Sequence, residues 1–434
     1  MRELERRFPD ALAVVGVHSG KYIAERVTDR IREASLRLGA THPVVNDRQF
    51  RVWRSYAVRA WPTLVVVDPR GYVVGQQAGE FFADDLAPAI EQLVAEAERA
   101  GTLVRGALPH ATESPAVAPG TLRYPGKVAV DGERMAIADS GHDRVLVGRL
   151  AGDGRRLRVT HVVGSGEPGL ADGPLATARL TMPQGLAFDG DRLYVADAGS
   201  HAVRVATLGE GGAGELRTLA GTGRRVRTAA ERRAGGMASP WDVALHAGTL
   251  YVAMAGTHQL WALDPATGRG CVHTGQGGED HHDDLLERAL LAQPMGLAVH
   301  EGRLVFADAE TSAVRWADVE RGGRVGTWVG TGLFDFGDVD GAGDAVRLEH
   351  VQHVAARPGD GRILVVDSYN DALKWLDPAT RRVETWVRGL HEPSGAAFGD
   401  GVVYVADADA HRVAVVEERT GEIGTLEIEL PAAG

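Results

Sequence analysis

The residues best suited to chemistry in this sequence are aspartates that recur at one position of a repeated pattern. Each ends a short apolar run, as in MAIAD, LYVAD, LVFAD and VYVAD. A set of such carboxylates could ring a metal ion, but a carboxylate at a strand end before a turn also suits hydrogen bonds to backbone N–H groups. Because a catalytic residue need not appear once per repeat, we expect a structural role and predict no catalytic residue. The set is Asp139, Asp197, Asp308, Asp367 and Asp407.

Histidines recur beside these acids. His201, His258 and His411 follow the acid position by four residues, and His142 follows it by three. Histidine is a common metal ligand. Its recurrence with the repeat favours stabilisation of a turn instead, and the sequence predicts neither a metal site nor a bound cofactor.

Two loops are rich in acidic groups. The stretch DFGDVDGAGD contains Asp335, Asp338, Asp340 and Asp344, and residues 279–284 read EDHHDD. Oxygen ligands of this kind attract Ca²⁺. The first loop has no glutamate at the twelfth position of an EF-hand, and its Asp-Gly pair aligns with the pair at Asp172, so we expect turns between repeats.

Other chemical motifs are weak or missing. Cys271 is the only cysteine, which leaves no partner for a disulfide and no multi-cysteine zinc site. We expect it to be a small apolar residue on a strand. The glycines of GSGEPG and GTGRR do not join a strand to a helix, so they do not indicate a dinucleotide site. The sequence contains no G-x-S-x-G or P-loop motif.

A fixed spacing places the recurring acids. A proline precedes the acid position by fourteen residues in five copies, at Pro125, Pro183, Pro240, Pro294 and Pro393. The third copy has Met254 in place of the acid. In a further copy Val351 occupies the proline position, and the two extra residues before Asp367 fall in the turn at 357–360, where an insertion is tolerated. The chain therefore contains six repeats.

Each repeat holds four short apolar runs. The fourth runs are THVVG, LRTLAG, GCVHTG, GTWVG, ETWVRG and GTLEIEL. Four short strands in each unit of about 40 to 60 residues are typical of propeller blades. A single blade cannot bury both of its faces, so we predict an all-β six-bladed propeller over residues 124–430. Because every unit has its own fourth run, the mode of ring closure stays open.

The first hundred residues have a different pattern. The run LAVVGVHS (12–19) indicates a buried strand, and apolar residues spaced by three or four over 22–38 indicate a helix. Further elements are a strand at PVVN, a helix over 49–57, two strands around the turn at 68–71, and a helix over 81–99. The predicted order is β-α-β-α-β-β-α, an α/β layer. Residues 101–123 have the composition of a linker.

Two motifs suggest a family. The segments YPGKVAV, MPQGLAF and EPSGAAF, each followed by an IAD or VAD run, resemble NHL repeats. Trp61 and Pro62 precede TLVVVD, a hairpin and a closing helix, which resembles the C-terminal two-thirds of the thioredoxin fold, where that proline is cis. The whole chain is similar to NHL-repeat-containing thioredoxin-like proteins. The resemblance implies a thioredoxin-like α/β domain over residues 1–100, N-terminally truncated and lacking the first βα unit and its CxxC.

The missing CxxC leaves two alternatives. The domain is either a degenerate relative without redox chemistry, or Met1 is an internal methionine of a longer protein; the resemblance of residues 1–19 to an interior stretch favours the second. Thiol–disulfide exchange normally needs a second cysteine to resolve the mixed disulfide. The 434-residue chain is therefore expected not to reduce disulfides.

Bulk properties narrow the function. A net charge of −12 disfavours nonspecific binding to nucleic acid. No apolar stretch approaches the ~20 residues of a membrane span, and the N-terminus lacks a signal-peptide pattern, so we expect a cytoplasmic protein. We predict a non-catalytic protein that binds a protein or peptide, and neither nucleic acid nor membrane. The alternatives are a thiol–disulfide oxidoreductase, if a CxxC lies upstream, or a metal-dependent propeller hydrolase or lyase.

Overall fold

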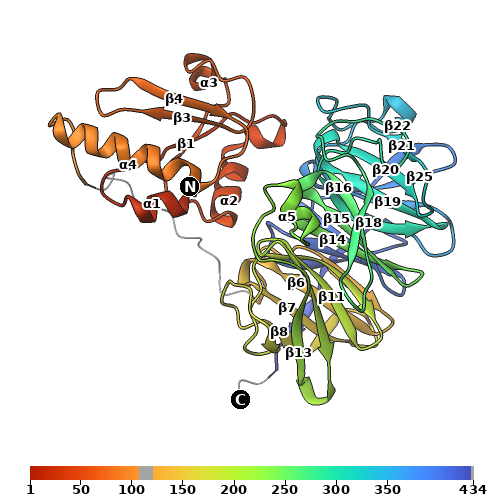
Figure 1. Cartoon of the computed structure of the whole chain (residues 1–434). Coiled ribbons are helices and arrows are strands. Elements are labelled where there is room, and N and C mark those ends of the chain that lie inside the picture. Colours follow the sequence, from red (N-terminus) through yellow and green to blue (C-terminus); the bar gives the residue numbers. More distant parts are fainter. Residues whose placement is uncertain (107–120, 432–434) are drawn as a thin grey trace. The chain divides into compact units, whose positions relative to one another are not determined.

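The computed structural model describes residues 1–106 and 121–431 (Figure 1). The chain divides into two compact units, Met1–Ala116 and Val117–Gly434. Most of the predicted linker, residues 107–120, lies outside the described residues.

The N-terminal unit has the predicted order of elements after one additional short helix. The elements are α1 (Arg2–Arg7), β1 (Gly16–His18), η1 (Ala24–Arg26), α2 (Thr28–Arg37), β2 (Val44–Asn46), α3 (Arg51–Ser55), β3 (Thr63–Val67), β4 (Val73–Ala78) and α4 (Ala83–Arg99). The predicted first strand is shorter than expected, and a separate 3₁₀ turn precedes the second helix. In the described residues β1 pairs with β2 in parallel and β3 pairs with β4 antiparallel, as two separate sheets and not one continuous layer.

The side chains of Asp47 and Trp61 make hydrogen bonds that hold the segments of this unit together. Asp47 is 5% exposed, and its carboxylate accepts the N–H groups of Arg51, Val52 and Trp53 at the start of α3. Trp61 donates its Nε1–H to the carbonyl of Ser19 at 2.7 Å. The Trp61–Pro62 peptide bond is cis, and β3 begins at the next residue.

The second unit is a six-bladed propeller, as predicted. Its strands form six sheets, which we number as blades in chain order. Blade 1 has β5 (Val128–Asp131), β6 (Arg134–Asp139), β7 (Arg144–Leu150), β8 (Arg156–Val163) and β31 (Glu427–Glu429); blade 2 has β9 (Gly173–Pro174), β10 (Pro183–Asp189), β11 (Arg192–Asp197), β12 (Ala202–Leu208) and β13 (Gly214–Gly221). Blade 3 has β14 (Pro240–His246), β15 (Thr249–Met254), β16 (Gln259–Leu263) and β17 (Gly270–Thr274); blade 4 has β18 (Pro294–His300), β19 (Arg303–Asp308), β20 (Ala313–Asp318) and β21 (Val325–Val329).

The last two blades follow the same plan. Blade 5 has β22 (Gly341–Ala342), β23 (Val351–Ala356), β24 (Ile363–Asp367), β25 (Ala372–Asp377) and β26 (Arg382–Arg388); blade 6 has β27 (Pro393–Phe398), β28 (Val402–Asp407), β29 (Arg412–Glu417) and β30 (Ile423–Thr425). Short 3₁₀ turns join the strands: η2 (Ser140–His142), η3 (Glu210–Gly212), η4 (Ala255–Thr257), η5 (Ala309–Thr311), η6 (Gly343–Ala345) and η7 (Ser368–Asn370). One helix, α5 (Ala229–Arg233), lies between blades 2 and 3.

Strand register confirms the alignment of the repeats. Pro183 pairs with Asp197 across the first two strands of blade 2. Val351 pairs with Asp367 in the same way, although the sequence between them is two residues longer. The expectation that Val351 occupies the proline position is therefore correct.

Ring closure uses the end of the last predicted run. GTLEIEL was expected to be the fourth strand of blade 6, but only its start belongs to β30. Residues 427–429 leave that blade and pair in parallel with Arg156–Arg158 of β8. The interpretation of GTLEIEL as one strand is wrong, because Leu426 is buried between blades 6 and 1 and turns the chain toward the latter.

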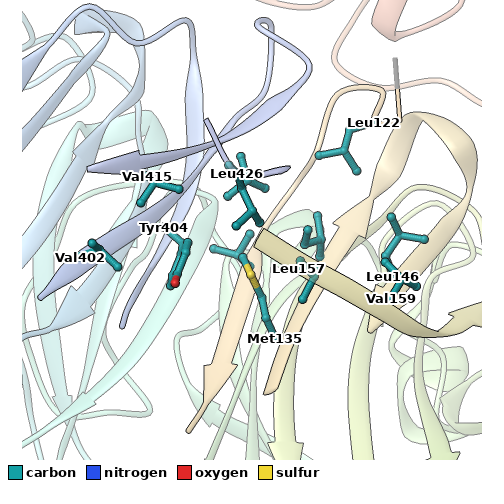
Figure 2. Close-up of a cluster of buried hydrophobic side chains, with 13 residues drawn as sticks. Leu122, Met135, Leu146, Leu157, Val159, Val402, Tyr404, Val415 and Leu426 are labelled. Atoms are coloured by element: carbon teal, nitrogen blue, oxygen red, sulfur yellow. The ribbon is translucent and has the colours of Figure 1, made fainter. Parts of the chain in front are cut away.

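Most of the propeller core consists of six apolar clusters, one between each pair of neighbouring blades. Figure 2 shows the cluster that joins blade 6 to blade 1, where Tyr404 and Val415 face Met135 and Leu157. Because each blade buries both of its faces against neighbours, no blade has a core of its own, and the stability of each blade depends on its neighbours.

Candidate functional site

The five recurring aspartates are fully buried, each with 0% of its surface exposed. In every case Oδ1 accepts a backbone N–H from the segment that enters the same blade, as Thr181 donates to Asp197 at 2.7 Å. The other four donors are Arg123 to Asp139, Ala292 to Asp308, Glu349 to Asp367 and His391 to Asp407. These carboxylates therefore point into the blades and do not form a shared ring.

The second oxygen of each acid contacts a cation from the third strand. In blades 2, 4 and 5 the cation lies seven residues after the acid, as with Arg315 and Asp308 at 2.6 Å, both 0% exposed. In blades 1 and 6 it lies five residues after the acid, as with Arg144 and Asp139 at 2.8 Å. Buried charges of opposite sign compensate each other here, which such burial requires.

The two acidic loops belong to the same networks. Lys374 Nζ lies 2.6 Å from Asp338 and 3.4 Å from Asp340, and also contacts Asp367 at 3.2 Å. Asp283, from the loop at 279–284, contacts Arg315 at 2.8 Å. The acids that could have bound Ca²⁺ are therefore paired with Lys374 in one loop and with Arg315 in the other.

These contacts affect the buried acid of blade 5. Burial raises the pKa of Asp367 to about 6, although Lys374 and the N–H of Glu349 oppose the rise. Burial also works against the charge of Lys374, but Asp367 and Asp338 together raise the pKa of this lysine above its ordinary value. The ammonium group therefore stays charged at the centre of the network.

Blade 3 lacks this network altogether. Met254 replaces the acid and Trp261 replaces the cation seven residues later. Trp261 donates its Nε1–H to Gln259, which in turn bonds the carbonyl of Gly275. The acid and its cation are thus lost together, and neither is left buried without a partner.

The histidines four residues after the acid position bond to the next blade. His201 Nδ1 accepts the N–H of Ser239 at 3.0 Å, and His258 accepts that of Gln293 at 3.1 Å. The sequence suggested that these histidines stabilise their own turns. In the structure they also accept hydrogen bonds from the next blade. The same position has a left-handed backbone in all six blades, with φ near +50°, a conformation in which His, Asp and Asn are enriched.

All six blades share this bond between neighbours. The other acceptors are Asp143 for Met182, Ser312 for His350, Asp371 for Glu392 and His411 for Tyr124. The last one crosses from blade 6 to blade 1. We call the six bonds the inter-blade latches.

A group that the sequence reasoning missed lies at the propeller axis. Lys127, Asp242 and His353 are 2%, 3% and 8% exposed and come from blades 1, 3 and 5. Lys127 Nζ lies 3.7 Å from Asp242 Oδ2, and His353 Nε2 lies 3.4 Å from the same oxygen. We call these three residues the axial triad.

Backbone groups complete the axial triad. Lys127 donates to the carbonyls of Gln352 and Ser394 at 3.0 and 3.1 Å. Asp242 accepts the N–H of Leu297 at 2.9 Å. His353 Nδ1 accepts the N–H of Ala396 at 3.2 Å, so the imidazole is neutral with its proton on Nε2. The triad thus links five blades across the axis.

Glycines make room for the triad. All three triad residues lie two positions after the proline position, where blades 2, 4 and 6 have Gly185, Gly296 and Gly395. A Cβ on Gly185 would lie 2.3 Å from Asp242 Oδ1, and one on Gly296 would lie 2.5 Å from the Cα of His353. The alternation of polar residue and glycine at this position was the signal in the sequence that could have located the triad.

Charge at the axis follows from burial and proximity. Burial lowers the pKa of Lys127 to about 8, and Asp242 opposes the change. Burial works to raise the pKa of Asp242, but Lys127 and His353 outweigh it, so the pKa of this carboxyl falls below its ordinary value. Burial and Lys127 lower the pKa of His353.

A divalent metal does not fit the axial triad. The ammonium group of Lys127 already provides the positive charge next to Asp242, and one carboxylate with one imidazole is a small donor set. Among the described residues, no group of three or more His, Cys, Asp or Glu side chains is arranged to hold a metal ion. The axis therefore gives no support for metal-assisted hydrolysis or elimination.

Two further features lie at the surface of the propeller. Cys271 lies on β17 as expected, but it is exposed. A groove of about 560 Å³ lies between blades 4 and 5. It is lined by His300, Glu301, Arg303, Trp328, Asp360, Gly361, Asp377, Pro378 and Ala379.

Comparison with known proteins agrees with the repeats found in the sequence. The model of the NHL repeat matches residues 180–206, which span β10 and β11 and most of β12. Blade 2 therefore contains an NHL repeat. NHL repeat-containing protein 2 of Homo sapiens is 32% identical over 471 aligned positions, which cover 96% of this chain and 64% of that protein.

Other similarities extend the comparison. The protein SUPPRESSOR OF QUENCHING 1, chloroplastic, of Arabidopsis thaliana is 35% identical over 466 aligned positions, which cover 98% of this chain and 43% of that protein. The chain thus spans less than two thirds of the length of these relatives. A crystal structure of a nidogen/laminin complex matches 66% of this chain and 90% of that chain at 14% identity, with a TM-score of 0.47.

In the described parts of the propeller and of the N-terminal unit, no helix has the length and apolar character needed to cross a membrane.

Proposed function

We propose that this chain is a non-catalytic interaction protein whose NHL propeller presents a binding surface to a protein or peptide. At the axis, where a propeller enzyme would place its reacting groups, the polar side chains contact one another and the backbone. Because these axial groups already have partners, we expect a protein or peptide to bind at the outer surface of the blades.

The observation that carries this proposal is the groove between blades 4 and 5. Trp328 lines it and is half-buried. Arg303, which also lines it, stacks on Trp316 with 4.1 Å between the guanidinium carbon and the ring centroid. Tryptophan and arginine dominate the binding energy of many protein interfaces, and a partly exposed indole in a concave surface is a suitable anchor.

The proposal includes a thioredoxin-like domain in the N-terminal unit. The order of its elements supports this, together with the parallel pairing of β1 and β2 and the antiparallel pairing of β3 and β4. Pro62 stands directly before β3, as in the resemblance noted from the sequence. Fold alone does not give function, so the redox role of such domains is not assigned to this chain.

Photo-crosslinking tests the proposed function. A photoreactive amino acid is placed at Ala379, which lines the groove, and separately at Ala151, an exposed alanine in the matching hairpin turn of blade 1. Irradiation of cells that produce the full chain should give a discrete protein adduct from position 379 that is lost in W328A. Identical adducts from both positions, or adducts unchanged by W328A, would count against the groove as a binding surface.

A further inference from the structure

The outer edge of blade 3 differs from those of most other blades. In blade 1, β31 pairs with the outermost strand, and in blades 2 and 5, β9 and β22 do so. In blade 4 the segment around Leu285 takes this place, since Val325 donates to Asp284 at 2.9 Å and Leu286 donates to Gly323 at 3.0 Å. The outermost strand is therefore covered by extended chain in four blades.

No described segment pairs with the outer edge of β17 in blade 3. This strand is five residues long, and Gly270 and Cys271 on it are exposed. Blade 6 also ends in an uncovered strand, but β30 has only three residues. An uncovered strand presents free N–H and C=O groups that can pair with another chain.

The segment that precedes blade 3 has the same length as the segments that cover the outer strands of blades 2, 4 and 5. Before blade 2, the N–H of Gly169 donates to the carbonyl of Leu180. Before blade 3, the N–H of Val226 donates to the carbonyl of Met237 in the same way. Both pairs span eleven residues, as do those that precede blades 4 and 5. The ends of the segment are thus fixed as in the other blades, while its middle differs.

In blade 3 the middle of this segment forms α5 and lays no strand along β17. Thr228 and Glu231 make a capping box at the start of α5, with Glu231 N–H donating to Thr228 Oγ1 at 3.1 Å. The acid that binds the third-strand cation in blades 2, 4 and 5 is missing from this segment. In blade 4 this acid is Asp283, which also accepts a hydrogen bond from Thr327. Blade 3 has Met254, Trp261 and Val272 where blade 4 has Asp308, Arg315 and Thr327. The whole set that anchors the covering segment has been replaced together.

The stretch of chain from Arg224 to Arg233, which includes the start of this segment, is strongly basic. It contains Arg224, Arg225, Arg227, Arg232 and Arg233 against one acid, Glu231, in a chain of net charge −12. Arg224 and Arg233 are exposed. Because this stretch replaces the segment that covers the outer strand in blades 2, 4 and 5, its positive charge favours a partner segment of negative charge.

We propose that the outer edge of β17 binds an extended, acidic segment of a partner protein, which adds a strand to blade 3. The partner would occupy the place that the chain's own extended segments fill in blades 1, 2, 4 and 5. Strand addition takes its affinity from backbone hydrogen bonds and its selectivity from side chains and charge. This surface is distinct from the groove between blades 4 and 5, so the two can be tested separately.

Cys271 provides the measurement, because it lies on β17 and is the only cysteine in the sequence. The probe is an acetylated seven-residue peptide of alternating glutamate and valine, added to the full chain while Cys271 reacts with 5,5′-dithiobis(2-nitrobenzoate). We expect saturable protection, with labelling slowed about fivefold, and slower amide exchange over residues 268–275. A peptide with a central proline should not protect, because it cannot complete the pairing.

Charge is tested with matched variants. R224Q/R233Q should weaken protection about tenfold in peptide concentration, whereas R192Q/R217Q, two exposed arginines of blade 2, should leave it unchanged. Equal protection by a lysine–valine peptide would overturn the assignment of an acidic partner. Fast labelling unaffected by any peptide, or slow labelling in the protein alone, would overturn the open edge itself, and neither result would alter the crosslinks expected from the groove.

Discussion

The backbone N–H of Tyr124 donates to Nδ1 of His411 across 3.1 Å, although 287 residues separate them in the chain. The two rings also meet edge to face at 4.3 Å. This contact is the latch between blades 6 and 1, and five equivalent latches join the remaining neighbours. The seam of the ring is therefore closed by the same bond as every other blade junction.

Replacement of His411 tests the contribution of this latch. H411A removes the acceptor and places alanine at a φ of +54°, so we expect a loss of about 1 to 2 kcal/mol in the free energy of unfolding. H411N keeps a side-chain acceptor and a residue that tolerates this backbone, and should lose less than half as much. Urea unfolding followed by tryptophan fluorescence measures both, and equal losses would argue against the latch.

The glycines at the axis give a steric prediction. G185A would place a Cβ 2.3 Å from Asp242 Oδ1 and 2.4 Å from its Cα, so we expect a loss of about 3 kcal/mol or more, or failure to fold. The matched control is G152A, where the added Cβ has nothing within 4 Å. Thermal unfolding compares the two, and a tolerated G185A would show that the axial triad can shift at little cost.

Acid should destabilise the propeller through His353. Burial and Lys127 lower the pKa of His353 below its ordinary 6.5 in the folded protein, so below pH 6.5 the unfolded chain binds a proton that the folded chain resists. This contribution to stability is complete above pH 6.5 and declines as the pH falls toward the folded pKa. Lys127 and Asp242, the two charged groups that face the imidazole, stay ionised over this range.

A series of urea midpoints between pH 7 and pH 5 measures the effect. One proton gives a slope of at most about 1.4 kcal/mol per pH unit. H353Q offers the same donor and acceptor without titrating, and should remove about one proton's worth of slope. Parallel profiles for the two proteins would contradict the neutral imidazole at the axis.

In blade 3, Met254 and Trp261 replace both the buried acid and its cation. We therefore predict that these two positions can be changed only together. M254D alone would bury a carboxylate beside Trp261, at a site with 0% exposure, so we expect a loss of about 3 kcal/mol or more. The double variant M254D/W261R restores the pair seen as Asp308 and Arg315, and should recover at least half of that loss. A double-mutant cycle on unfolding free energies measures the coupling, which would vanish if the two positions were independent.

Disulfide reduction gives a test of chemistry. With Cys271 as its only cysteine, the 434-residue chain cannot cycle between a dithiol and an internal disulfide. In an insulin-reduction assay with dithiothreitol, we expect the rate of the uncatalysed reaction. Turnover that depends on the protein and disappears in C271S would contradict this expectation and assign thiol chemistry to Cys271.

The spacing of proline and aspartate was enough to predict six blades, including the displaced copy at Val351 and Asp367. That pattern is local, because each pair is joined by the first hairpin of one blade. The axial triad depends on contacts between residues more than a hundred positions apart, so its members had no local signature except their shared place after the proline position. Only the alternation with Gly185, Gly296 and Gly395 marks that place as crowded.

Ring closure shows a second limit of local reasoning. GTLEIEL has the composition of one strand, yet Leu426 is buried between two blades, and the residues on either side of it join different sheets. Apolar content alone does not say which sheet a strand joins. The N-terminal unit shows the same limit, since short strands and a 3₁₀ turn replaced part of the regular pattern expected over residues 12–38.

The parallel pairing of β31 with β8 also has a consequence for biosynthesis. Blades 2 to 5 are each complete in sequence as the ribosome releases them, so they can pack in order during translation. Blade 1 must wait with its outer strand unpaired until Glu429 has emerged, some 270 residues after Arg158. The face of blade 1 that blade 6 covers in the finished ring also stays exposed throughout this interval, and a pause or premature stop before blade 6 would leave that face to chaperones or proteases.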